Sequence, residues 1–145
     1  MYIALEEAKK AQNKGEIPIG AVVVYKNKII SQQHNMKENL KCSTRHAEIL
    51  SIEDASRYLD TWRLNDCDLY VTMEPCVMCC GAMLQARINK VYYLVENNKF
   101  GGINSLDYIK SYEHTNHQLK YELIKDINLE TEYVNMLKKF FEEKR

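Results

Sequence analysis

The apolar residues near the start of the chain recur with the period of an α-helix. Four of them fall on one helical face: Ala4, Leu5, Ala8 and Ala11. Gly15 follows this face, at a place where a helix commonly ends. The period then changes, because GAVVVY and KIISQ are short apolar runs separated by KNK, in which Asn27 suits a turn. The pattern predicts an N-terminal helix followed by a β-hairpin.

Helix-like and strand-like segments alternate through the rest of the chain. Apolar spacing predicts a helix over about 44–58, with Ser43 or Thr44 as its N-cap. A second helix is expected from Cys76 to about Arg87, directly after a proline. DLYVTM, KVYYLV and QLKYELI have the short apolar or alternating pattern of strands. A last helical stripe lies near the C-terminus: Leu129, Tyr133, Met136, Leu137 and Phe140. Strands interleaved with helices indicate a three-layer α/β domain.

Composition narrows the class of protein only a little. A chain of 145 residues with 46% apolar and 28% charged residues is expected to form one domain over 1–145. Twenty basic residues balance twenty acidic ones, which excludes a general polycation but allows a local basic patch. The chain lacks an apolar run long enough for a transmembrane helix, and its amphipathic, acid-containing N-terminus is unlike a signal peptide, so a cytoplasmic location is expected.

The cysteines are the first sign of chemistry. Five of them, an odd number, are poor material for disulfides in a reducing compartment. Cys76 and Cys79 are spaced to share one helical face at a helix start, where the peptide dipoles favour thiolates. With His46 they would give a Zn²⁺ ion three protein ligands, and the open fourth position is typical of a catalytic site.

Glu48 is the candidate proton carrier beside this metal. It lies two residues after His46, so on a helix it points about 200° away and is a poor fourth ligand. A carboxylate in that place can deprotonate a bound water molecule. The alternative is a closed structural site that recruits another thiol, from Cys80, Cys67 or Cys42.

These motifs resemble a known superfamily. HAE followed by PCVMC is similar to the signature of the zinc-dependent cytidine and nucleobase deaminases. The stretches GEIPIGAVVV, HAEIL, LYVTMEPCVMCCGAM and ARINKVYY are more narrowly similar to bacterial tRNA adenosine deaminases of the TadA type. The resemblance implies a cytidine-deaminase-like α/β/α fold with a central mixed five-stranded sheet. It also implies zinc held by His46, Cys76 and Cys79, with Glu48 as the catalytic proton carrier.

The resemblance further implies a substrate. It predicts conversion of adenosine to inosine at wobble position 34 of a tRNA anticodon loop, expected in tRNA-Arg, by a homodimer. Seven residues would line the substrate site: Ile17, Asn35, Ala47, Asn97, Lys99, Phe140 and Phe141. Taken from the residues alone, Asn35 suits a turn, Ile17 suits the core, and at least one of the two phenylalanines is expected in the core.

Three positions depart from the family pattern. Arg45 replaces a small residue before His46, where it would contact a phosphate or narrow the entrance. Cys80 places a competing thiol beside Cys79. Asn97 stands where these enzymes usually have aspartate, so recognition of the ribose 2′-hydroxyl is expected to weaken and single-stranded DNA becomes a candidate substrate.

Two other functions remain open from the sequence. A guanine deaminase or another free-base deaminase shares the scaffold, although Val77 and the segment EIPIG favour the tRNA enzyme. A catalytically silent, zinc-stabilised RNA-binding subunit is the other alternative, and the presence of Glu48 argues against it.

Overall fold

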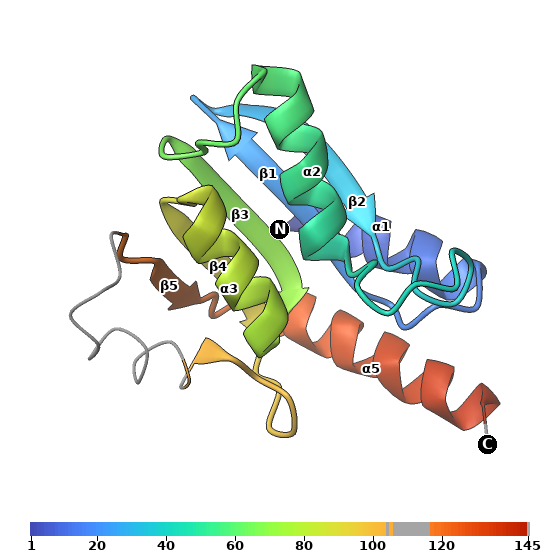
Figure 1. Ribbon diagram of the computed structural model, residues 1–145. Helices are drawn as coiled ribbons and strands as arrows, with labels where there is room; N and C mark the ends of the chain where they lie inside the picture. The colour runs from blue at the N-terminus through green and yellow to red at the C-terminus, as the bar shows by residue number, and fades with distance from the viewer. Residues whose placement is uncertain (104, 106–116, 145) are drawn as a thin grey trace.

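A mixed sheet forms the centre of the computed structural model (Figure 1), which describes residues 1–103, 105 and 117–144. Within those residues the strands are β1 (Gly20–Tyr25), β2 (Lys28–His34), β3 (Cys67–Met73), β4 (Lys90–Val95) and β5 (Lys120–Leu123). Their order across the sheet is β2-β1-β3-β4-β5. β1 runs antiparallel to both β2 and β3, whereas β3, β4 and β5 are parallel to one another.

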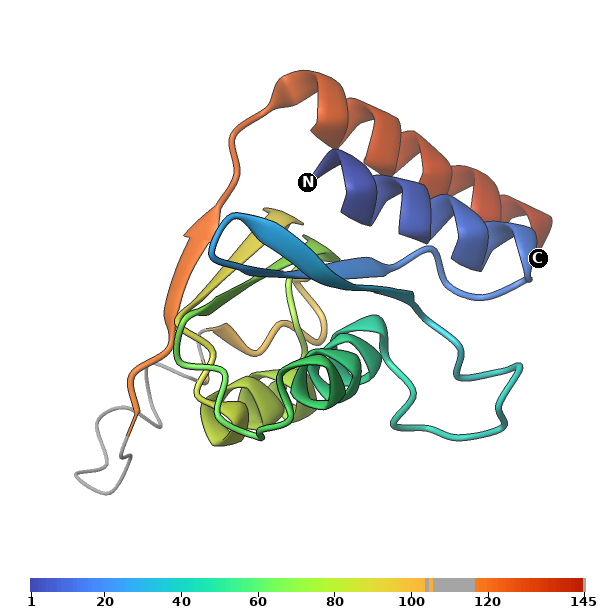
Figure 2. The same ribbon diagram turned by 90° about the horizontal axis from the view of Figure 1, so that it is seen from above.

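Helices cover both faces of this sheet. They are α1 (Tyr2–Asn13), α2 (Ala47–Leu59), α3 (Val77–Ala86) and α5 (Ile127–Glu143). Figure 2 shows α1 and α5 side by side over one face, with α2 and α3 over the other. The predicted three-layer α/β/α architecture with a mixed five-stranded sheet is confirmed. Among the described helices, none combines the length and the apolar character needed to cross a lipid bilayer.

Each face of the sheet has its own apolar core. Cys67, Leu69 and Val71 of β3 pack with Met83 of α3 and Ala55 of α2 on one face, and all are almost fully buried. On the other face α1 and α5 meet β4 through a second buried set: Leu5, Ala8, Leu94, Leu129, Tyr133 and Met136. β3 is therefore covered on both sides, which explains its nearly continuous apolar sequence.

The predicted turn of the hairpin is present. Lys26 and Asn27 connect β1 to β2 with φ angles of 47° and 61°, in the left-handed region that short hairpin turns need. Asparagine tolerates this region better than most residues, so the turn follows from local sequence.

The helix starts differ from the prediction. α2 begins at Ala47 with His46 as its N-cap residue, so the expected caps Ser43 and Thr44 were wrong. The segment before His46 turns back on itself through a hydrogen bond from the Arg45 amide to the Cys42 carbonyl, 3.1 Å long, which delays the helix. α3 likewise begins at Val77, one residue after the expected start.

Candidate active site

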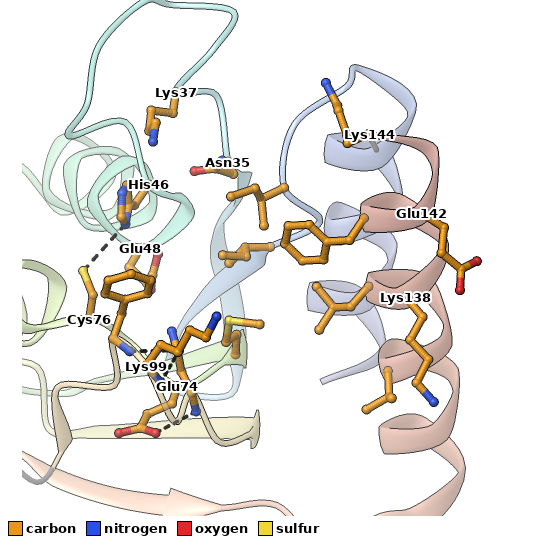
Figure 3. Close-up of a pocket in the computed structure, with 18 residues that line it drawn as sticks. Asn35, Lys37, His46, Glu48, Glu74, Cys76, Lys99, Lys138, Glu142 and Lys144 are labelled. Atoms are coloured by element: carbon orange, nitrogen blue, oxygen red, sulfur yellow. Dashed lines mark hydrogen bonds between the residues drawn. The ribbon is translucent and has the colours of Figure 1, made fainter.

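Three potential metal ligands converge at the starts of α2 and α3. The Nδ1 atom of His46 lies 3.7 Å from the Cys76 Sγ and 3.6 Å from the Cys79 Sγ, and the two sulfurs are 3.6 Å apart. His46 and Cys76 are the residues immediately before the two helices, and Cys79 lies in the first turn of α3. Figure 3 shows His46 and Cys76 facing each other across the space between the helix starts.

These separations match the edges of a tetrahedral zinc site. With Zn–S bonds of about 2.3 Å and a Zn–N bond of about 2.05 Å, a regular tetrahedron has S···S and S···N edges of about 3.8 and 3.6 Å. The observed edges differ from these values by a few tenths of an ångström at most. Soft thiolates and an imidazole are also donors that zinc prefers. The donor set and its geometry therefore fit a zinc ion with one position open.

The pKa values of the two cysteine thiols are shifted in opposite directions. The Cys79 thiol, and then His46, interact with Cys76 and lower the pKa of its thiol to about 4, against the effect of burial. The same contact with Cys76, together with burial, raises the pKa of Cys79 far above its ordinary value. The pair thus retains one proton in a buried place, and a divalent cation can replace that proton.

The carboxyl group of Glu48 lies beside this cluster with an unused oxygen. The residue is only 3% exposed, and its Oε2 has no hydrogen-bond partner among the described residues. Burial raises the pKa of this carboxyl group, while the neighbouring His46 opposes the rise. A buried acceptor without a protein partner is suited to a water molecule or a substrate group that enters the cavity.

The alternative closed site does not form. The Sγ atom of Cys80 is directed at the carbonyl oxygen of Pro75, at 3.6 Å, and Cys42 Sγ lies 3.4 Å from the Thr44 hydroxyl. Cys67 is buried at the start of β3. Within the described part of the chain, the ligand group comprises His46, Cys76 and Cys79, so no fourth protein ligand closes it.

A cavity of about 1100 Å³ opens over these residues. His46, Glu48 and Cys76 line it, and with the adjoining Cys79 we call them the cavity floor. Its mouth, on the outer side, consists of Ile17 after α1, Asn35 and Lys37 after β2, part of the loop 97–103, the C-terminal half of α5 and Lys144. Figure 3 shows Lys138 and Glu142 of α5, and Lys144 directly after it, across the cavity from the floor. A volume of this size holds more than one small molecule such as a free base.

Asn35 is held in place by an acid that the sequence analysis did not select. Glu16 is fully buried, and its carboxylate accepts hydrogen bonds from the Asn35 amide group at 3.2 Å and from the backbone of Asn39 at 2.7 Å. Because the Asn35 nitrogen is engaged by Glu16, its oxygen is left to act as an acceptor in the cavity. Burial raises the pKa of Glu16, but the hydrogen bonds from Asn39 outweigh it and the pKa falls below its ordinary value.

The other predicted substrate residues separate into two groups. Ile17, Lys99 and Asn97 line the cavity. Ala47 does not, because it is fully buried at the start of α2.

Phe141 lines the cavity and is 49% exposed, whereas Phe140 is 6% exposed and belongs to the core. Their rings meet edge to face with centroids 5.3 Å apart. The expectation that at least one of them is a core residue is confirmed, and Phe140 is that residue. Val134 and Leu137 extend the apolar wall of α5 beside Phe141.

Of the lysines that line the cavity, only Lys99 was predicted from the sequence. These lysines are Lys37, Lys99, Lys138 and Lys144. On α1, Lys9 pairs with Glu6 and Glu132, and Lys10 pairs with Glu7, so their charges are neutralised away from the cavity. The sequence alone could not distinguish the lysines that line the cavity from those that form ion pairs on α1, because the difference lies in neighbours that only the fold provides.

Two of the sequence departures have a clear structural context. Arg45 donates to both carboxylate oxygens of Glu53, each at 2.8 Å, and is not among the residues lining the cavity. The Oδ1 atom of Asn97 accepts hydrogen bonds from the backbone amides of Lys99 and Phe100, at 3.3 and 3.1 Å. The side chain of Asn97 therefore shapes its own loop.

Comparisons with known proteins show that the chain is similar to deaminases. The model of the MafB19-like deaminase family matches residues 1–145. A tRNA-specific adenosine deaminase of Bacillus subtilis is 44% identical over 145 residues, which cover all of this chain and 88% of that protein. A structure solved in a study of A-to-I editing by tRNA:A34 deaminases has a TM-score of 0.85 at 36% identity, covering 94% of this chain and 97% of the other.

Guanine deaminases share the fold at a greater distance. The enzyme from Nitrosomonas europaea has a TM-score of 0.72 at 21% identity, covering 94% of this chain and 80% of the other. A similarity at that level of identity supports the shared architecture alone.

Proposed function

This protein belongs to the MafB19-like deaminase family, and on that premise we propose that it converts adenosine to inosine at the wobble position of a tRNA anticodon loop. The observation that carries the proposal is the cavity floor. There, three ligand atoms with the spacing of a zinc site lie beside a buried carboxyl group whose Oε2 lacks a partner among the described residues. The same residues fit the hydrolysis of an aromatic amine, which needs a strong nucleophile and a relay for its protons.

His46, Cys76 and Cys79 would hold the zinc ion. When bound, the zinc ion would act as a Lewis acid and lower the pKa of water at the open position. Because two thiolates neutralise much of the ion's charge, a nearby base is needed to complete the deprotonation. Glu48 is in the place to supply that base.

Glu48 carries the protons of the reaction. Its carboxylate accepts a proton from the attacking water and delivers it to N1 of the adenine ring as oxygen bonds to C6. It then transfers the second proton to the leaving amine, the C6–N bond breaks, and inosine and ammonia are the products. The net reaction consumes one water molecule, and Glu48 returns to its starting state.

The mouth of the cavity supports a nucleic-acid substrate. Lys37, Lys99, Lys138 and Lys144 place positive charge around an opening that is wider than one base needs. Loop nucleotides can be splayed out so that one base enters while its neighbours remain outside, which a base within a duplex cannot do. Phe141 offers an exposed ring on which a neighbouring base can stack.

We also infer the partners and location from the proposed substrate. Val77 and Met78 at the start of α3 and Phe100 in the adjoining loop are exposed apolar side chains, which is consistent with a homodimer. The substrate would be a tRNA, expected to be tRNA-Arg, so we expect the protein to act in the cytoplasm. Single-stranded DNA is a weaker candidate substrate because of Asn97.

The test is a competition among substrate classes. The purified, zinc-loaded protein is incubated separately with an anticodon stem-loop containing A34, with free guanine and with free cytidine, and the products are measured by mass spectrometry. We expect inosine from the stem-loop alone. Glu48→Ala protein prepared in parallel is the control for contaminating deaminases. Turnover of guanine but not of the stem-loop would replace the proposed function with guanine deamination.

A further inference from the structure

The carboxylate of Glu74 joins two ends of one loop. Its Oε2 accepts a hydrogen bond from the amide of Asn97 at 2.9 Å, and its Oε1 accepts one from the amide of Ile103 at 3.1 Å. The backbone amide of Glu74 also donates to the carbonyl of Val95, at 2.8 Å. Glu74 therefore connects the end of β3 to both ends of the mouth loop, residues 97–103.

The mouth loop has a further set of bonds to the segment that carries Cys76. The amide of Gly102 donates to the carbonyl of Pro75 at 2.8 Å, and Gly101 forms an isolated bridge with Cys76. Within the loop, the amide of Gly101 donates to the carbonyl of Asn97, also at 2.8 Å. The loop is thus bound to Pro75 and to Cys76, the two residues that lead into α3.

The adjacent glycines allow this close approach. A Cβ atom at Gly101 would lie 2.5 Å from both oxygens of the Glu74 carboxylate, and one at Gly102 would lie 2.7 Å from the Cys76 carbonyl carbon and the Val77 nitrogen. Real Cβ atoms do not approach other atoms so closely. Any side chain at Gly101 would therefore displace the carboxylate from its two amides.

The loop in turn supplies part of the cavity wall. Asn97, Lys99 and Phe100 line the cavity together with Glu74 and the floor residue Cys76. Lys99 and Phe100 are exposed, and the amides of both are held by the side chain of Asn97. Their positions relative to the floor depend on contacts between the loop and residues 74–76.

We propose that Glu74 is a positioning residue that holds the mouth loop against the Cys76 segment and so sets the substrate-binding wall of the cavity. It acts on substrate binding and leaves the metal site intact. The part of this proposal that concerns turnover rests on the proposed function, whereas the part that concerns the loop does not.

The first experiment measures the loop directly, by amide hydrogen exchange on the zinc-loaded full chain. Glu74→Gln keeps the shape of the side chain but replaces one acceptor oxygen with a donor. We expect exchange at Asn97 and Ile103 to become at least about tenfold faster, while the Cys80 amide inside α3 is unchanged. Glu96→Gln, which removes the same charge from an exposed position one residue before the loop, should leave both amides unaffected. Unchanged exchange at Asn97 and Ile103 in Glu74→Gln would overturn the proposal.

The second experiment measures kinetics and metal content. Glu74→Gln should bind one zinc per chain and show a KM for the A34 stem-loop raised about tenfold, with kcat within about threefold of wild type. Equal kinetics despite faster exchange would reduce Glu74 to a structural role and overturn its positioning function. If the wild-type protein does not deaminate the stem-loop, the proposed function fails, and the exchange experiment still decides whether Glu74 holds the loop.

A double-mutant cycle identifies the contact. Gly101→Ala alone should raise KM much as Glu74→Gln does, because the added methyl group displaces the carboxylate. In a Glu74→Ala background, Gly101→Ala should add little, since the atoms that it meets are gone. Additive effects of the two substitutions would show that they act separately and would overturn the proposed link.

Discussion

The floor and the mouth of the cavity are assembled from different amounts of chain. The floor takes its reactive side chains from two short segments, 46–48 and 76–79, each at the start of a helix. The mouth takes its residues from a loop after α1, a turn after β2, the loop 97–103 and α5 near the C-terminus. The residues that carry the chemistry therefore come from two short segments, whereas the residues that contact the substrate are brought together by packing of distant segments. Substitutions at the floor should abolish metal binding or turnover, whereas substitutions at the mouth should have smaller effects on stability, KM or substrate preference.

The largest effect is expected from removing a ligand of the floor. Cys79→Ser should lose both zinc and turnover, as should His46→Ala, because two remaining ligands hold the ion poorly. Cys80→Ser is the matched control, since the Cys80 thiol is directed at the Pro75 carbonyl, and it should retain zinc and most activity. Metal analysis of the purified proteins checks both. Zinc retained by Cys79→Ser and lost by Cys80→Ser would reverse the assignment.

Removal of the proton carrier should separate metal binding from catalysis. Glu48→Ala is expected to keep about one zinc per chain while kcat falls by at least about a thousandfold. The reason is that Glu48 is placed beside the ligand group without belonging to it. Zinc content, thermal unfolding and turnover should be measured on the same preparation. A zinc-free, unfolded Glu48→Ala protein would make Glu48 a structural residue instead.

The buried carboxylate of Glu16, which holds Asn35 at the mouth, should contribute to the stability of the fold. Glu16→Gln is expected to lower the free energy of unfolding at pH 7 by about 1–3 kcal/mol, because a buried carboxylate that accepts hydrogen bonds from Asn35 and Asn39 is replaced. The exposed neighbour Glu38 provides the control variant Glu38→Gln, for which little change is expected.

The pH dependence of this difference follows from the lowered pKa of Glu16. A depressed acid stabilises the fold above its unfolded pKa, near 4.5, and loses that contribution as pH falls through its lower folded value. The gap in unfolding free energy between wild type and Glu16→Gln should therefore shrink below about pH 4.5. A gap that stays constant down to acid denaturation would mean that Glu16 is not ionised in the fold.

A smaller effect is expected from one lysine of the mouth. Lys99→Ala should raise KM for the stem-loop about tenfold at low salt and make the slope of log affinity against log salt shallower by about 0.7, the value for one contact with a single strand. Lys9→Ala removes the same charge from α1, where it pairs with Glu6 and Glu132, and should change neither quantity. Equal slopes in all three proteins would place the RNA path elsewhere.

The smallest effect concerns the sugar of the substrate. The single acceptor oxygen of Asn97 is already used by two backbone amides of its loop. An aspartate could serve those amides with one oxygen and offer the other to a ribose 2′-hydroxyl. Asn97→Asp should therefore raise the ratio of RNA to DNA rates on matched hairpins by about fivefold. If the ratio does not rise, Asn97 has no part in sugar selectivity.

The comparison also explains what the sequence could predict. Cys76 and Cys79 lie at one helix start, so their spacing alone predicted that they meet. The apolar periods of about 3.6 residues in helices and 2 in strands predicted the layers. Glu16 and Glu74 were not selected because their partners, Asn35, Asn39 and the 97–103 loop, are distant in sequence. A carboxylate that accepts hydrogen bonds from backbone amides leaves no pattern of residue types in the sequence, so only the fold reveals its role.

The same limit applies to helix starts and to paired charges. Ser43 and Thr44 have the chemistry of N-caps, but the turn before His46 makes a histidine the N-cap residue. Arg45 was expected to contact a phosphate or to narrow the entrance, but its Nη1 atom donates to both carboxylate oxygens of Glu53. Tertiary neighbours decided each case, and local propensity did not.

His46 and Cys76 occupy N-cap positions without making a side-chain cap bond. Serine, aspartate or asparagine at either position would stabilise its helix, typically by about 1 kcal/mol, and would remove a ligand. Selection for heat resistance alone would therefore erode these two positions, whereas selection for turnover preserves them. The active site therefore costs the fold some stability at the residue before each of two helices, where a metal ligand stands in place of a better N-cap.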